Sequence, residues 1–187
     1  MIDIRRYEGA QILDLTAAVA DAYADVFDRP AEVRSRFVER LQRDAHRPGF
    51  RAITAAATDS PQPIAAFASG WITQAPFRSD RAYGDVAAQL GPTDVAALLV
   101  GALEVDELAV RAERRGTGLG RRLLDALVAD APQGRAWLLT AADNHPAIAF
   151  YRRVGWQQYP VRPGGSDPVT VFYRPAAPRR DAGSDQR

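Results

Sequence analysis

The stretch RRGTGLGRR, residues 114–122, places three glycines at alternate positions directly before an apolar helical pattern. Residues 104–110, ahead of it, are predicted to form a strand. The helix that follows repeats its apolar side chains at Leu123, Leu124, Leu127 and Val128. Glycine lets a backbone approach a ligand closely, and the free N–H groups of a first helical turn suit a pyrophosphate. The stretch therefore predicts a phosphate-binding turn between a strand and a helix.

The sequence motifs of two better-known phosphate-binding loops do not match this stretch. A nucleotide triphosphatase loop ends in Lys followed by Ser or Thr, which residues 116–122 lack. A dinucleotide fold uses GxGxxG, whereas the spacing here is GxGxG. Arginines 114, 115, 121 and 122 would suit phosphate oxygens. A glycine-rich helix entry with a solvated arginine face, binding nothing, is the alternative interpretation.

A second distinctive stretch, NHPAIAFYRRVGW, occupies residues 144–156. Asn144 and Pro146 are typical of a helix start, and Gly155 is typical of a helix end. One side of the predicted helix is apolar: Ala147, Phe150, Tyr151 and Val154. A buried strand at residues 136–140 precedes it.

The remaining patterns predict one α+β domain over residues 1–174. A short strand around Ile2 and Ile4 precedes an apolar helical spacing from Ile12 to Val26, and a second helix follows over residues 30–45. Strands are expected at residues 50–57, 64–73 and 169–173, the first two as a hairpin. Within residues 74–102 we expect short helical pieces at 86–90 and 95–99. Residues 175–187 have almost nothing to bury, which predicts a disordered tail.

Composition excludes several function classes. The formal net charge is +1, so no overall field attracts nucleic acid or a membrane surface. Cysteine is absent, which removes disulfides and thiolate chemistry. His46 and His145 are the only histidines and are far apart in sequence, so we expect no metal. The charged N-terminus and the lack of a long apolar run favour a cytoplasmic protein.

The two distinctive stretches together resemble the GNAT acetyltransferases. Arg115, Gly118 and Gly120 fill the family's motif A, Arg/Gln-x-x-Gly-x-Gly/Ala after a strand. Residues 144–156 are similar to its motif B, Asn-x-x-Ala-x-x-x-Tyr-x-x-x-Gly-Phe, with Trp156 as the final aromatic. The resemblance implies a GNAT fold: a central mixed, mostly antiparallel sheet, flanked by helices and splayed at its fourth and fifth strands. Acetyl-CoA would enter the gap.

The resemblance also implies which residues bind acetyl-CoA. The pantetheine arm would pair with the backbone of Leu108, Ala109 and Val110. The pyrophosphate would lie beside Arg115 and on the amides of Gly116, Thr117, Gly118, Leu119, Gly120 and Arg121. Asn144 matches the motif B asparagine that contacts the cofactor, although the same side chain also suits a plain helix N-cap.

For catalysis, the resemblance implies that Tyr151 protonates the departing thiolate. A tyrosine that only packs on its helix is the alternative. Glu104 matches a position where several family members carry a general base, and an exposed strand-edge carboxylate is its alternative. Strand alternation predicts Glu104 and Asp106 on one face and Glu107 on the other.

The leading function is N-acetylation of a small primary amine, such as a polyamine, an amino acid derivative or an aminoglycoside-like compound. Acetylation of a protein N-terminus or lysine is the alternative enzyme, and a non-catalytic acetyl-CoA-binding module is the alternative class. The oligomeric state stays open, a homodimer included. Trp71, Phe77 and Tyr83 are candidates to line the acceptor pocket, although anchoring of the loop is the commoner role for such residues. Asp80, Asp85 and Asp94 are candidate carboxylate contacts for a cationic acceptor, although solvated loop acids are the favoured explanation.

Overall fold

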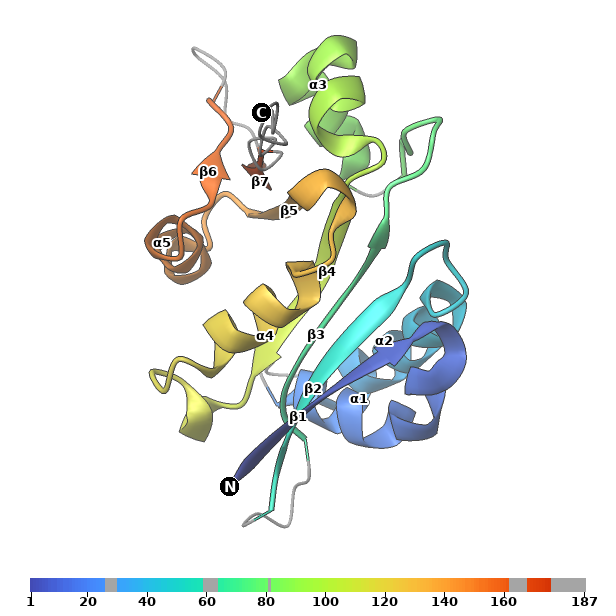
Figure 1. Cartoon of the computed structure of the whole chain (residues 1–187), viewed down its shortest axis with the longest axis vertical. Coiled ribbons are helices and arrows are strands. Elements are labelled where there is room, and N and C mark those ends of the chain that lie inside the picture. The colour runs from blue at the N-terminus through green and yellow to red at the C-terminus, as the bar shows by residue number, and fades with distance from the viewer. Residues whose placement is uncertain (26–29, 59–63, 81, 162–167, 176–187) are drawn as a thin grey trace, which may run out of the picture.

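The computed structural model describes residues 1–25, 30–58, 64–80, 82–161 and 168–175. Within them the chain forms a seven-stranded sheet in the order β1-β2-β3-β4-β5-β7-β6 (Figure 1). The strands are β1 (Ile2–Glu8), β2 (Arg51–Ala57), β3 (Ile64–Ile72), β4 (Leu103–Val110), β5 (Ala136–Ala141), β6 (Gln157–Gln158) and β7 (Val169–Arg174). Of the pairs between them, β4 with β5 is parallel and the others are antiparallel. The expected mixed, mostly antiparallel α+β sheet is confirmed.

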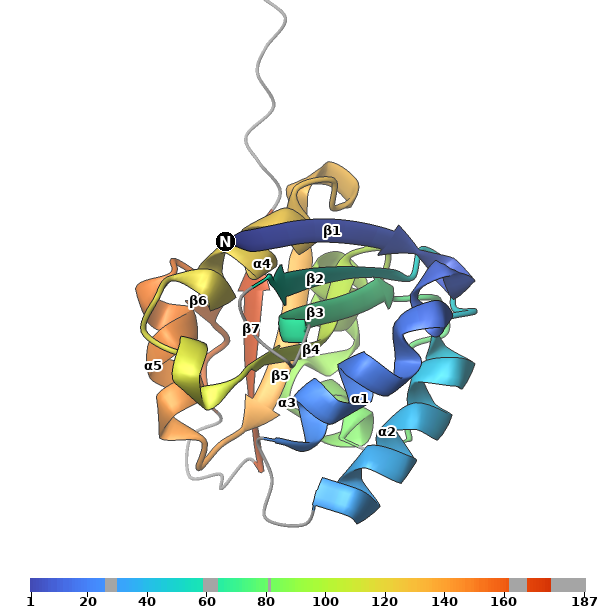
Figure 2. The same ribbon diagram turned by 90° about the horizontal axis from the view of Figure 1, so that it is seen from below.

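Helices cover both faces of the sheet. They are α1 (Thr16–Ala24), α2 (Pro30–Asp44), α3 (Tyr83–Asp94), α4 (Leu119–Val128) and α5 (His145–Arg153). Figure 2 shows α1 and α2 on one side of the sheet and α4 and α5 on the other. One buried cluster joins Leu123, Leu124 and Leu127 of α4 to the sheet, and another joins α1 and α2 to its opposite face. None of the described helices is long and apolar enough to cross a membrane.

The β4–β5 pair opens along its length. Its register contains Leu103 with Ala136 and Glu104 with Trp137, and no further pair among the described residues. Because β4 continues to Val110, its later residues face β5 across a gap instead of a hydrogen-bonded ladder. The splay expected between the fourth and fifth strands is therefore present, and it positions the site described below.

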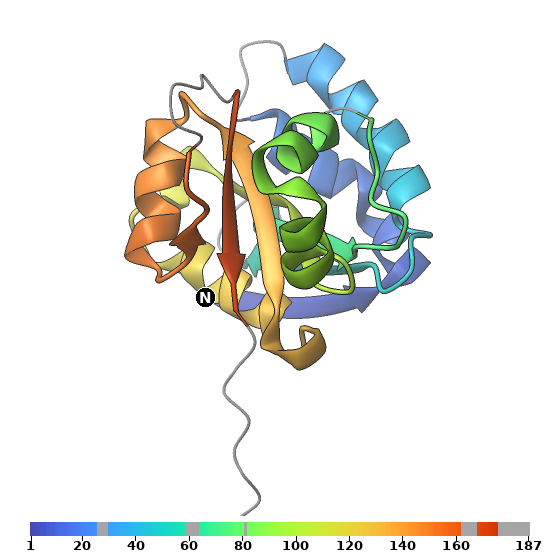
Figure 3. The same ribbon diagram turned by 90° about the horizontal axis from the view of Figure 1, so that it is seen from above.

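The segment after β3 folds into a third small core. Helix α3 bends at Gly91, whose φ of 75° precedes Pro92, and a single π-helical turn, Val95–Leu99, follows. Figure 3 shows α3 beside β5 and β7. There Val86 and Leu90 pack with Trp137 and Val171. Helical pieces were expected at 86–90 and 95–99, and the first is longer than the sequence pattern indicates.

Two elements differ from the sequence prediction. The apolar spacing from Ile12 begins in a 3-10 helix, Gly9–Leu15, which has a capping box between Glu8 and Gln11 at its start. The α-helix begins only at Thr16. Strand β6 was not expected, because two residues are too short to show a period. Val26, most of the hairpin turn and residues 176–187 of the expected tail lie outside the described residues. Short 3-10 helices Ala112–Arg114 and Pro132–Gly134 complete the fold.

Candidate active site

A cleft of about 610 Å³ fills the gap between β4 and β5. Strand β4 and Tyr23 of α1 form one wall, and β5 with α5 forms the other. The ladder between β4 and β5 stops after Glu104, so the later β4 backbone groups on this edge lack ladder partners. The lining residues are Tyr23, Asp106, Glu107, Leu108, Ala109, Val110, Arg115, Gly120, Leu139, Thr140, Asn144, Pro146, Ala147, Phe150 and Tyr151.

The glycine turn forms the start of α4 as the sequence predicts. Gly118 is the N-cap with φ 79° and ψ 0°, a left-handed conformation that favours glycine. No side chain caps this helix, so its first-turn amides are available to a ligand. A Cβ on Gly120 would lie 3.5 Å from Val110 Cγ2 and 3.6 Å from Phe150 Cζ, which shows how closely the helix approaches β4 and α5 there.

The other predicted cofactor residues have different local roles. Arg115 Nε donates to the Val110 carbonyl at 3.1 Å, which ties the turn to the end of β4. The Thr117 hydroxyl donates to the Arg114 carbonyl at 2.7 Å. Asn144 Oδ1 accepts from the Ala147 amide at 3.3 Å, so this side chain is a helix N-cap that also lines the cleft.

Some predicted cofactor residues lie outside the cleft lining. Gly116, Thr117, Gly118, Leu119 and Arg121 belong to the turn and the first turn of α4. The Leu119 side chain is buried in the core with the other α4 leucines. Their contact with a cofactor would come through backbone amides, and it stays a prediction.

Tyr151 lies in the wall of the cleft opposite β4. Its ring packs 5.2 Å from that of Phe150 and 5.4 Å from that of Phe172, measured between centroids. Burial, with a smaller effect from the Glu107 charge, raises the pKa of Tyr151 to about 12. The hydroxyl is therefore protonated at neutral pH, and the residue forms part of the cleft wall.

A bulge in β4 overturns the predicted alternation of its acidic residues. Gly70 pairs with Val105 and Ser69 pairs with Glu107, so Asp106 is an extra residue in the ladder. Beyond the bulge every side chain changes face. Glu104 and Glu107 consequently lie on the same face, toward α1, α2 and α3. Both Asp106 and Glu107 line the cleft. The expected placement of Glu107 on the face opposite Glu104 is therefore wrong, whereas Glu104 and Asp106 do line one small pocket together.

Glu104 is buried beside the cleft instead of inside it. With Ala82, Tyr83, Val105, Asp106 and Leu139 it lines an adjoining pocket of about 90 Å³, the Glu104 pocket. Trp71 Nε1 donates to Glu104 Oε2 at 3.1 Å, and the Tyr83 hydroxyl donates to Oε1. Burial raises the pKa of Glu104 to about 7, although these hydrogen bonds oppose the rise. The exposed strand-edge alternative for Glu104 is thus wrong, because only 4% of the residue is exposed.

The raised pKa of Glu104 predicts a pH dependence of stability. Between about 4.5 and 7 the folded protein retains a proton that the unfolded chain releases, so the free energy of unfolding falls as pH rises through this window. Glu104→Gln should flatten this part of the profile, and Glu39→Gln, on an exposed position of α2, should not. Urea unfolding at a series of pH values measures both. Equal slopes in wild type and Glu104→Gln would contradict the assignment.

Tyr23 is a site residue that was not singled out from the sequence, and Glu107 was expected only as a strand residue on the opposite face. Tyr23 enters the cleft from α1, about 80 residues from β4 in sequence, and no local pattern indicates that contact. Glu107 pairs with Arg40 of α2. Burial, together with the neighbouring Asp106, raises the pKa of Glu107. Side chains of α1 and α2 therefore pack against the acidic part of β4 on this face.

Comparison with known proteins identifies the family. The model of the Acetyltransferase (GNAT) family matches residues 17–156, a range that contains β4, β5 and α5 and nearly all of α1, the elements around the cleft. The chain belongs to the GNAT family. Acetyl-CoA is the cofactor of GNAT acetyltransferases, and the motifs that carried the resemblance lie at the turn before α4 and along α5.

Two relatives match shorter segments. One segment of 85 residues is 36% identical to the N-alpha-acetyltransferase RimI of Mycobacterium tuberculosis, covering 43% of this chain and 49% of that protein. Another of 60 residues is 45% identical to an uncharacterised protein of Mycobacterium leprae, covering 32% of this chain and 17% of that protein. The matches thus span about half or less of these relatives.

Solved GNAT structures share the fold over nearly the whole chain. A GNAT-family protein of Desulfovibrio desulfuricans has a TM-score of 0.63 at 18% identity, covering 95% of this chain and 100% of that one. The PaiA N-acetyltransferase of Thermoplasma acidophilum, solved in complex with coenzyme A, has a TM-score of 0.54 at 12% identity, covering 94% and 99%. At these identities the likeness concerns the GNAT fold.

Proposed function

We propose that this protein is an acetyl-CoA-dependent N-acetyltransferase that transfers the acetyl group directly to a primary amine. One observation carries the proposal: the β4–β5 cleft has the uncapped start of α4 at one end and the Tyr151 side chain in its wall. A phosphate-binding element and a proton donor thus share one cleft. The coenzyme A complex of the PaiA relative supports a role for this fold in binding that cofactor.

The residues present fit acetyl-CoA. The backbone edge of β4 beyond Glu104 offers unpaired amide and carbonyl groups to the amides of a pantetheine arm. The first-turn amides of α4, with the positive end of the helix dipole, suit a pyrophosphate. Arg115, at the same end, adds a guanidinium.

The chemistry needs an uncharged amine, a proton acceptor and a proton donor. Acetyl-CoA supplies the thioester carbonyl that the amine attacks. Tyr151 holds the proton that the departing sulfur takes up. We assign Glu104 as the base, because its pKa of about 7 suits proton uptake at neutral pH and its pocket shares Asp106 and Leu139 with the cleft.

The acceptor in this proposal is a small molecule. Phe77 and Tyr83, from the segment after β3, pack against Trp137 and close the Glu104 side of the site. A confined pocket of this kind suits a small amine better than a folded protein. The RimI relative favours a second candidate, acetylation of a protein N-terminus, and a non-catalytic binder would have no need of Tyr151.

Thiol release from acetyl-CoA, measured over a panel of small amines and short peptides, tests the proposed function. We expect release that depends on the amine and is faster with at least one small amine than with any peptide. Release only with peptides would favour the second candidate. Cofactor binding without any amine-dependent release would contradict the enzyme and leave the binding module.

A further inference from the structure

A second small pocket lies beyond the Glu104 pocket, at the start of β4. Its walls include Arg47, Trp71, Arg78, Tyr83 and Glu104, and we call it the arginine pocket. It shares Tyr83 and Glu104 with the Glu104 pocket, which in turn shares two residues with the β4–β5 cleft. The three spaces are therefore neighbours, with Tyr83 and Glu104 in the walls of both small pockets.

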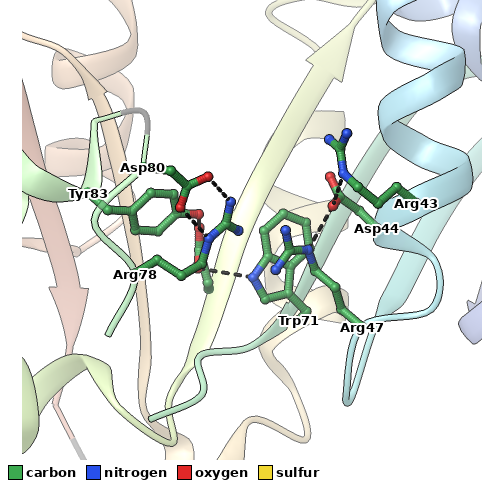
Figure 4. Close-up of polar contacts among 8 residues, drawn as sticks. Arg43, Asp44, Arg47, Trp71, Arg78, Asp80 and Tyr83 are labelled. Carbon is green, nitrogen blue, oxygen red and sulfur yellow. Dashed lines mark hydrogen bonds and ion pairs between the residues drawn. The ribbon is translucent and has the colours of Figure 1, made fainter. Parts of the chain in front are cut away.

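Each arginine of this pocket lies over an aromatic ring. The guanidinium carbon of Arg47 lies 4.6 Å from the Trp71 ring centroid, and that of Arg78 lies 4.6 Å from the Tyr83 ring centroid. Figure 4 shows the side chains of both pairs, Arg47 with Trp71 and Arg78 with Tyr83. A cation–π contact of this kind, together with an ion pair, restrains the guanidinium before a ligand arrives.

The acidic partners of these arginines lie outside the pocket lining. Asp44 accepts from Arg47 Nε at 2.7 Å, and Asp80 accepts from Arg78 Nε at 2.8 Å, as Figure 4 shows. The Asp80 contact uses Nε and Nη2 of Arg78. Its remaining nitrogen, Nη1, is buried and has no hydrogen-bond partner among the described residues. A buried guanidinium N–H without an acceptor is costly, and an anionic oxygen in the pocket would satisfy it.

We propose that the acceptor carries an anionic group, a carboxylate or a phosphate, which Arg47 and Arg78 bind while its amine faces Glu104 and the cleft. This inference rests on the proposed acetyltransferase activity and names the class of acceptor. The arginines and Glu104 line the same pocket, so one acceptor spans both. A polyamine or aminoglycoside would meet two guanidinium groups there. Asp80, considered as a contact for a cationic acceptor, is instead paired with Arg78.

Matched acceptors that differ in one charge test the proposal. We expect alanine and β-alanine to have a kcat/KM about 10- to 100-fold higher than alaninamide and β-alaninamide, the gain of charge-assisted hydrogen bonds. A second comparison, of kcat/KM for phosphoethanolamine with that for ethanolamine, tests a phosphate group in the same way. A preference in the first pairs identifies a carboxylate, and a preference in the last pair identifies a phosphate. Equal acetylation of charged and neutral members in both comparisons would overturn the proposal.

Variants of Arg47 and Arg78 test whether these two residues cause the preference for an anionic acceptor. Arg78→Gln and Arg47→Gln should each bring the acid-to-amide ratio of kcat/KM toward one by raising KM for the acid. The lysine variants at both positions should restore part of the ratio, which a purely structural role would not predict. Arg43→Gln is the matched control, because Arg43 contacts the same Asp44 at 3.4 Å but does not line the pocket. A ratio changed equally by the control would overturn the proposal.

A binding measurement keeps the proposal testable if no amine is acetylated. At matched ionic strength, propionate or inorganic phosphate should raise the melting temperature of the wild type more than propionamide does. Arg78→Gln should lose that difference. Turnover without charge preference would thus count against the anionic acceptor alone, whereas anion binding without turnover would count against the proposed enzyme alone. Absence of any anion effect, in turnover and in melting, would overturn the inference.

Discussion

Tyr151→Phe is expected to reduce kcat by about 10²- to 10⁴-fold, the usual loss when a general acid is removed. The substitution deletes only the hydroxyl, so the ring should keep its packing on Phe150 and Phe172. The affinity for acetyl-CoA should hardly change. Steady-state rates and cofactor binding, measured on the same preparation with an acceptor from the panel, give both quantities.

Tyr173→Phe is the matched control for this loss. Tyr173 is a partly buried tyrosine of β7 that packs with Tyr159 and does not line the cleft. Removing its hydroxyl should leave turnover near the wild-type value. Unchanged turnover in folded Tyr151→Phe, with binding intact, would show that another group protonates the thiolate and that Tyr151 only packs.

Gly118→Val is expected to abolish stabilisation of the protein by acetyl-CoA. In the wild type, cofactor at about 100 times its Kd should raise the melting temperature by roughly 5–10 °C. A valine at φ 79° is strained, and its side chain would stand at the N-cap where the α4 amides face the ligand. The variant should therefore melt lower and show no rise on adding cofactor.

Gly91→Val is the control that distinguishes backbone strain from obstruction of the cofactor site. Gly91 has φ 75°, and as at Gly118 a Cβ added there would meet nothing within 4 Å, but the residue sits in α3 away from the cleft. This variant should lose stability as Gly118→Val does and still respond to acetyl-CoA. A normal cofactor response in Gly118→Val would show that the glycine turn does not bind the pyrophosphate.

The elements that could be predicted are those with a local signature. Gly118 lies in the predicted turn before α4, in a left-handed conformation that favours glycine, and Asn144 and Pro146 begin α5 as expected. The splay of β4 from β5 followed from the family resemblance, not from any period in the strands. Helix α3 was underestimated because its core contacts, such as Leu90 with Trp137, join segments distant in sequence.

The acidic and basic side chains of the acceptor side could not be predicted in the same way. The bulge at Asp106 depends on how β4 pairs with β3, and it reverses the face of Glu107 without any glycine or proline in β4 to indicate it. Arg47 and Arg78 come from segments on either side of the hairpin. Their meeting beside Glu104 is a property of the folded sheet, so sequence patterns pointed to Asp80 and to a cationic acceptor instead.

A crystal structure of the protein with acetyl-CoA tests the central claim most directly. We expect the pantetheine arm between β4 and β5, hydrogen-bonded to the backbone of Leu108 to Val110, and the pyrophosphate on the amides at the start of α4. The sulfur should lie within hydrogen-bonding reach of the Tyr151 hydroxyl. Acetyl-CoA bound elsewhere, or bound in the cleft with its sulfur remote from Tyr151, would contradict the account.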